Sequence, residues 1–104
     1  MGSREELHEE FCALLGSRNV YFQAPPSLRM QYDAIRYEPS GKDLKHANDK
    51  IYLNTNRYEG VIIARDPDSM MELMDNVLKH FRMCSPGKPY TAENLNHYPF
   101  TLYY

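Results

Sequence analysis

The residues best suited to chemistry form an acidic group at Asp66, Asp68 and Glu72. Carboxylates this close in sequence could hold Mg²⁺ or Ca²⁺ through oxygen ligands. The group lacks the further acidic positions and the glycine of an EF-hand loop. Capping of a helix that begins near Ser69 explains the same residues, because carboxylates at a helix N-terminus meet unpaired N–H groups and the helix dipole. We therefore favour capping over metal binding.

Four histidines, His8, His46, His80 and His97, are the next group that could bind a metal. They fall on a predicted helix, a loop, a second helix and a late turn, and no HxxxH pair or cysteine at ligand spacing joins them. A zinc site generally needs three or four such ligands. The sequence therefore predicts no zinc site and no metal cofactor.

The two cysteines, Cys12 and Cys84, are far apart in sequence and match no CxxC spacing. Free cysteines are among the most often buried residues, so we interpret both as buried thiols in a reducing cytosol. His80 lies four residues before Cys84, which makes contact feasible, but no GxSxG elbow or phosphate-binding glycine loop is present. No enzymatic activity and no cofactor are predicted.

Composition excludes two broad classes of protein. The chain has 104 residues, with 12 basic and 14 acidic side chains and a net charge of -2. A nucleic-acid-binding protein normally shows a basic patch, so sequence-independent binding to phosphates is disfavoured. No stretch approaches the roughly 18 apolar residues that a membrane span requires. One domain over residues 1–104 is expected, because this length suits a single core.

Two amphipathic helices are predicted, over about residues 4–15 and 70–82. Each begins with a capping box, in which Ser and a Glu three residues later satisfy unpaired helix N–H groups. Gly16 can end the first helix in the left-handed conformation. The capping boxes are Ser3 with Glu6 and Ser69 with Glu72, and the apolar stripes are Leu7, Phe11, Leu14 and Leu15, then Met71, Met74, Leu78 and Phe81.

Four segments are typical of strands. Residues 19–23 are aromatic and β-branched and are closed by two prolines, which indicates a short edge strand. Residues 30–38 form the next extended segment, and both of its faces are partly apolar. Residues 50–65 make a long strand in which Gly60 could introduce a bend. Residues 90–104 close the chain with further strand-like sequence.

These elements predict a two-layer α+β domain in the order αβββαβ, because each element has an apolar face that needs a partner layer. We expect an antiparallel or mixed sheet of about four strands, packed by two helices. The early strands should pair as a meander, and the last strand should join the sheet after the second helix. The polar stretch from Pro39 to Asp49 is predicted to project as a long hairpin loop.

Tyrosine is the most unusual feature of the composition, with nine residues and no tryptophan. Tyr98, Tyr103 and Tyr104 lie together near the end of the chain. Tyrosine is amphipathic and suits surfaces that become buried in assembly. It also favours ordinary half-buried strands, so both interpretations stay open.

Five stretches taken together resemble a family of small siphophage proteins. Three of them are Val20–Ser27, Tyr52–Tyr58 and Asp66–Ser69, and the late ones are Tyr90–His97 and Phe100–Tyr104. The resemblance covers nearly the whole chain, although the run Met83-Cys84-Ser85 departs from the family pattern. The family sits among head-to-tail genes and is similar in size and αβββαβ order to tail-terminator proteins.

The resemblance implies a structural virion protein without catalysis. Such a protein forms a ring, expected to be a hexamer, that caps the tail tube, ends tail polymerisation and offers a head-joining surface. Its implied partners are further copies of itself, the major tail tube protein and a head-tail connector or stopper protein. Its implied place is the tail or neck of the virion, after assembly in the bacterial cytoplasm. No membrane and no sequence-specific nucleic acid is involved, although DNA can pass through the ring lumen.

A closed ring needs one side of the domain to fit the opposite side of its neighbour. In such rings the long hairpin often faces the tube or the lumen, and the late polar segment with the terminal tyrosines is a second candidate contact. Turn chemistry explains the asparagines of that segment equally well. The candidate interaction residues are Lys42, Asp43, Lys45, His46 and Asp49 in the hairpin, and Asn94, Asn96, His97, Tyr103 and Tyr104 near the end.

Three alternatives remain. Another neck component, such as a head-completion or connector-stopper protein, would share the assembly role but contact the portal side. A small metal-dependent enzyme would use Asp66, Asp68, Glu72 and His97, and divalent metal would then raise its thermal stability. A regulatory binding module would stay monomeric at every concentration.

Overall fold

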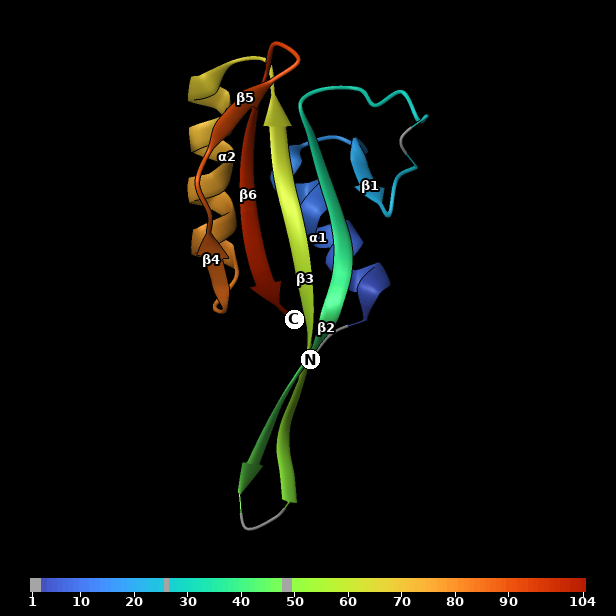
Figure 1. The fold of residues 1–104 in the computed structure, drawn as a ribbon, viewed down its shortest axis with the longest axis vertical. Coiled ribbons are helices and arrows are strands. Elements are labelled where there is room, and N and C mark those ends of the chain that lie inside the picture. The colour runs from blue at the N-terminus through green and yellow to red at the C-terminus, as the bar shows by residue number, and fades with distance from the viewer. Residues whose placement is uncertain (1–2, 26, 48–49) are drawn as a thin grey trace.

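The computed structural model describes residues 3–25, 27–47 and 50–104, and for 42–47 and 50–55 it describes the backbone only. Two helices pack on one face of a mixed six-stranded sheet, which confirms the predicted α+β class (Figure 1). The two short strands β4 and β5 add to the predicted order. The elements are α1 (Arg4–Leu15), β1 (Val20–Phe22), β2 (Ala34–Ala47), β3 (Lys50–Ala64), α2 (Pro67–His80), β4 (Cys84–Pro86), β5 (Tyr90–Ala92) and β6 (Leu95–Tyr103).

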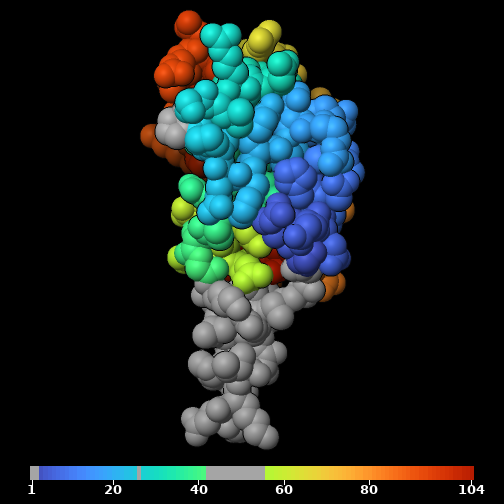
Figure 2. All heavy atoms as spheres, turned by 90° about the vertical axis from the view of Figure 1, so that its right-hand side faces the viewer, coloured from blue at the N-terminus to red at the C-terminus, as the bar shows by residue number. Residues whose placement is uncertain are grey.

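The strands lie in the order β1-β2-β3-β6-β4, with β5 also paired to β6. The last long strand joins the sheet after α2, as predicted. The predicted meander is wrong for the first pair, because β1 runs parallel to β2. A parallel pair needs a connection of about a dozen residues to bring the chain back to the same end. Residues 23–33 provide that connection, and residues 27–33 and α1 cover the β2 side of the molecule (Figure 2).

A long hairpin loop is predicted at residues 39–49, but the described residues 39–47 continue β2 rather than forming a loop. β2 runs to Ala47 and β3 begins at Lys50, with the first register shift between Pro39 and Gly41. Polar side chains favoured a loop at the sequence level. A strand ladder depends on backbone groups, however, and a register shift accommodates a proline that cannot donate to it.

Helix α1 has the predicted ends. The hydroxyl of Ser3 accepts the backbone N–H of Glu6 at 3.2 Å, and the Glu6 carboxylate accepts the Ser3 N–H at 3.3 Å. Gly16 follows the helix with φ of 80°, a conformation that glycine adopts without strain. Both halves of the capping box are therefore formed.

Helix α2 begins earlier than predicted, and the Ser69–Glu72 capping box is wrong. The N-cap is Asp66, whose Oδ1 accepts the backbone N–H of Asp68 at 3.3 Å. Pro67 occupies the first turn, where its missing N–H costs nothing. Ser69 lies inside that turn and donates its hydroxyl to Asp66 at 3.4 Å. Among the described residues, no helix is long and apolar enough to cross a membrane.

The core lies between the helices and the sheet, and Phe11 of α1 is at its centre. Its ring lies 5.1 Å from that of Tyr37, 5.5 Å from Phe81 and 5.9 Å from Phe100, measured between centroids. These rings come from α1, β2, β6 and the end of α2, so one side chain joins the layers. The predicted buried thiol of Cys12 is in this core, whereas Cys84 is only half-buried.

Gly60 lies in the middle of β3, and the register shifts of the β2–β3 ladder lie elsewhere, so Gly60 is not the site of a bulge. Gly60 pairs directly with Phe100 of β6. The Phe100 ring lies over the glycine, so that a Cβ placed there would overlap the ring. Close approach of an aromatic ring, rather than a bulge, explains this glycine.

We expect Gly60→Ala to lower the free energy of unfolding by about 1–3 kcal/mol, the usual cost of overpacking a core. Phe100 is only 2% exposed, so its ring has little room to move away. Urea unfolding of the two proteins measures the loss. In a Phe100→Leu background the same substitution should cost clearly less, and an equal cost in both backgrounds would contradict the ring contact.

Candidate interaction surfaces

The β2–β3 hairpin projects from the body of the molecule (Figure 1). β6 pairs with β3 only from Arg57 to Ala64, and β1 pairs with β2 only as far as Tyr37. Beyond these strand pairs, Asn56 also exchanges backbone hydrogen bonds with Tyr104, and residues 42–47 of β2 pair only with β3. At the base of the hairpin, the Arg57 guanidinium links β3 to β2. It donates to the hydroxyl of Ser40 at 3.1 Å and to the Ser40 carbonyl at 2.8 Å.

The hairpin carries half of the predicted interaction residues. Lys42, Asp43, Lys45 and His46 lie on the projecting part of β2, and their side chains are outside the described residues. Asp49 lies outside the described residues altogether. The structure therefore places four of these positions on a ribbon that extends from the body.

The late polar segment forms the turn between β5 and β6. Glu93 and Asn94 are its two central residues, with φ of 53° and 63°. Positive φ at both positions is what a two-residue hairpin turn of type I′ requires. The side-chain amide of Asn96 donates to the carbonyls of Ala64 at 3.4 Å and Arg65 at 3.2 Å, and so ties the turn to the end of β3. The contacts of both asparagines are those of turn and strand structure.

His97 stacks on Tyr90 across the β5–β6 pair, with the ring centroids 4.8 Å apart and the planes 11° apart. Its Nδ1–H donates to the carbonyl of Leu95 at 3.1 Å, which leaves Nε2 as an acceptor. Tyr90 is 51% exposed. The pair therefore offers an aromatic surface to a partner.

Tyr103 and Tyr104 lie at the other end of β6, beside the base of the hairpin. Tyr104 exchanges backbone hydrogen bonds with Asn56, at 2.9 and 3.2 Å. Its hydroxyl donates to the Glu10 carboxylate, which also accepts from Nε2 of His80 at 2.7 Å. Burial and then the bond to Glu10 raise the pKa of Tyr104 well above its ordinary value. The structure thus separates the terminal tyrosines from Asn94, Asn96 and His97.

The face of the sheet away from the helices carries a shallow groove of about 410 Å³. Glu38 and Glu59 lie directly opposite each other across the antiparallel β2–β3 pair, an arrangement that is unfavourable for like charges without a compensating partner. We call this surface the open sheet face, and define it by Arg36, Glu38, Glu59, Val61, Tyr90 and Pro99.

Sequence reasoning missed the open sheet face. The alternation of polar and apolar residues along β2 and β3 could have placed Glu38 and Glu59 on one face. Their pairing depends on the register of the hairpin, and the position of Tyr90 depends on the turn at Glu93. Neither can be obtained from periodicity alone.

Asp66, one of the acidic residues considered for metal binding, is the N-cap of α2 and accepts the backbone N–H of Asp68. His97 is on β6 and stacks on Tyr90, in a different element from Asp68 and Glu72 of α2. Among the described residues, no group of three or more His, Cys, Asp or Glu side chains could hold a metal ion.

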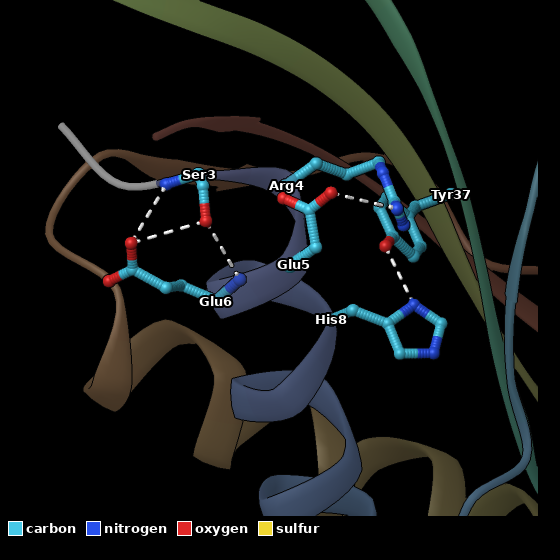
Figure 3. A network of polar contacts seen from close by, with 6 residues as sticks. All are labelled: Ser3, Arg4, Glu5, Glu6, His8 and Tyr37. Carbon is cyan, nitrogen blue, oxygen red and sulfur yellow. Dashed lines mark hydrogen bonds and ion pairs between the residues drawn. The ribbon is translucent and has the colours of Figure 1, made fainter.

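His8 of α1 contacts Tyr37 of β2 in the body of the protein (Figure 3). Its Nδ1 is hydrogen-bonded to the Tyr37 hydroxyl at 2.8 Å. Burial, followed by the positive charges of Arg4 and Arg18, lowers the pKa of His8 below its ordinary value of 6.5, although Glu9 opposes this. The folded protein therefore favours the neutral ring.

We expect stability to fall as the pH decreases from 7 to 5.5, partly because of His8. Below pH 6.5 the unfolded chain binds a proton at His8 more readily than the folded chain, so acid favours unfolding. His8→Gln should show a shallower decrease in urea midpoint over this range. The same slope in both proteins would assign the pH dependence to other groups.

The comparisons with known proteins add no assignment. No family model, no curated protein and no solved structure matches this chain. The geometry of the hairpin and the two faces of the domain therefore supply the structural support for a functional proposal.

Proposed function

We propose that this chain is a structural subunit of a bacteriophage tail, which assembles into a closed ring of about six copies that caps the tail tube. The ring ends polymerisation of the tube and offers its other side to a head-tail connector or stopper protein. The sequence segments resemble a family of small siphophage proteins that is similar in size and element order to tail-terminator proteins, and this resemblance supplies the biological setting. The structure adds physical reasons to expect assembly.

The projecting hairpin is the observation that carries the proposal. A two-stranded ribbon alone is at best marginally stable in water, and its outer edges offer unpaired N–H and C=O groups. The hairpin extends the molecule to 50 Å along one axis against 25 and 23 Å along the others. Contact with a tube or with neighbouring copies would cover these edges, which a free monomer leaves open to water.

The second support is that the domain has two different sides. The helices cover one face of the sheet (Figure 1). The other face carries the groove, which Tyr90 helps to line. Closed rings form when one surface of a subunit fits a different surface of the next. A two-layer domain with unlike outer faces meets this requirement. A neck component on the portal side would use the same geometry and remains the second candidate.

The test is the solution mass of the full chain by light-scattering chromatography over a concentration series, with negative-stain images of the largest species. The same protein is then incubated with purified tail tubes and sedimented. Rings of about six subunits, alone or at tube ends, are the expected result. A monomer that neither forms rings nor binds tube ends would overturn the proposal, and binding to connector rings alone would favour the other neck component.

A further inference from the structure

Among the described residues, four large apolar side chains are exposed, and the two most exposed, Tyr90 and Met71, lie on different surfaces of the domain. Tyr90, 51% exposed, lies on the open sheet face, and Met71, 48% exposed, lies on the outer side of α2. Met71, Asp75 and Lys79 recur every four residues along that helix. The exposed Arg82 follows just beyond the helix, after the extended residue Phe81. We call these four residues the outer α2 face. All four are exposed, whereas Met70, Met74 and Val77 face the core.

Toward the hairpin, the charge on the open sheet face changes from positive to negative, and the charge on the outer α2 face changes from negative to positive. On the open sheet face, Arg36 is followed toward the hairpin by the paired carboxylates of Glu38 and Glu59. On the outer α2 face, Asp75 is followed by Lys79 and Arg82.

Both sequences of charge run in the same direction. α2 starts after Ala64, which pairs with Asn96 at the end of the sheet far from the hairpin. It ends before Cys84, which pairs with Leu102 near the hairpin base. β2 also runs toward the hairpin. A neighbour displaced sideways, without inversion, would therefore place Arg36 near Asp75, and the two carboxylates near Lys79 and Arg82.

We propose that the open sheet face docks onto the outer α2 face of a second copy of this chain. This inference rests on the proposed ring and names its subunit interface. The two surfaces lie on opposite layers of the domain, so each copy can use one for the preceding neighbour and the other for the next. Tyr90 contacts the second copy near Met71, and the basic end of the outer α2 face compensates the like-charged pair Glu38 and Glu59.

Site-directed cross-linking tests the contact directly. A photoreactive benzoylphenylalanine replaces Tyr90 in the full chain, which is mixed with ¹⁵N-labelled wild-type protein and irradiated, alone at high concentration and with tail tubes. Cross-links from position 90 to labelled peptides of α2 are expected. Cross-links to any other segment, or none under either condition, would overturn the docking.

Charge exchange supplies a second test that is independent of the probe. The pair Glu38→Lys and Glu59→Lys makes the sheet face basic, and the pair Lys79→Glu and Arg82→Glu makes the helix face acidic. Each double variant alone should lose the ring at concentrations where the wild type forms it. An equimolar mixture should restore rings, because each variant fits the other in alternation. Glu93→Lys, in the exposed β5–β6 turn, is a single charge-reversal control and should leave assembly unchanged.

The outcomes separate this inference from the proposed function. If the wild type forms rings but position 90 cross-links to a segment other than α2, the docking is refuted and the ring stands. The same conclusion follows if the wild type forms rings but the mixture of charge variants does not. Cross-linking to α2 in open chains without rings supports the docking and removes the closed cap. Absence of rings, tube binding and intermolecular cross-links removes both.

Discussion

Phe11→Ala is expected to lower the free energy of unfolding by about 3–5 kcal/mol, the usual range for removing a buried aromatic side chain. Phe11 has no exposed surface and contacts rings from β2, β6 and the end of α2. Its loss leaves a cavity where the layers meet. A small domain has only about 5–15 kcal/mol of net stability, so the variant should melt far below the wild type.

Tyr90→Ala is the matched control, because it removes a similar ring from an exposed position. Its urea midpoint should stay close to that of the wild-type monomer. Equal losses of stability in the two variants would contradict the assignment of Phe11 to the centre of the core. Comparison at low protein concentration keeps subunit contacts from adding to the measured stability of the control.

The helices could be predicted from sequence because their signals are local. The Ser3–Glu6 capping box, the apolar stripe and Gly16 lie within fourteen residues, and the structure places each as expected. The start of α2 was misplaced because two candidate caps, Asp66 and Ser69, lie three residues apart. The proline between them favours the earlier cap, because its ring suits the first helical turn.

The sheet was less predictable because pairing joins residues that are distant in sequence. The parallel pairing of β1 depends on how residues 23–33 return along the sheet, and no local pattern specifies that path. The polar composition of residues 39–49 suppressed a strand prediction, although the ladder continues to Ala47. Glu38 faces Glu59 because of the register of this ladder, so their pairing could not be predicted without that register.

In the candidate interaction surfaces, too, local features could be predicted and long-range contacts could not. The turn interpretation of Asn94 was available from residue type, and its positive φ agrees with it. The stacking of His97 on Tyr90 requires the β5–β6 pairing, and the placement of Tyr104 against Glu10 requires the tertiary fold. A cluster that was close in sequence therefore became two separate places at opposite ends of one strand.

Shortening the hairpin is expected to abolish assembly while leaving the domain folded. Replacing residues 43–55 with Asn-Gly retains the pair Lys42 and Asn56 and closes it with a two-residue turn that suits the twist of antiparallel strands. The contact of Arg57 with Ser40 lies below the cut and should be preserved. The core contacts of Phe11 are also untouched.

The expected readout of this variant is a thermal unfolding midpoint close to that of the wild-type monomer, together with loss of tail-tube capping. Because this variant keeps the body of the domain and removes only the outer hairpin, it shows whether the hairpin is needed for contact with the tube or for folding of the domain. Normal tail length with the shortened hairpin would show that the ribbon is dispensable, and the tube contact would then have to lie on the body of the domain.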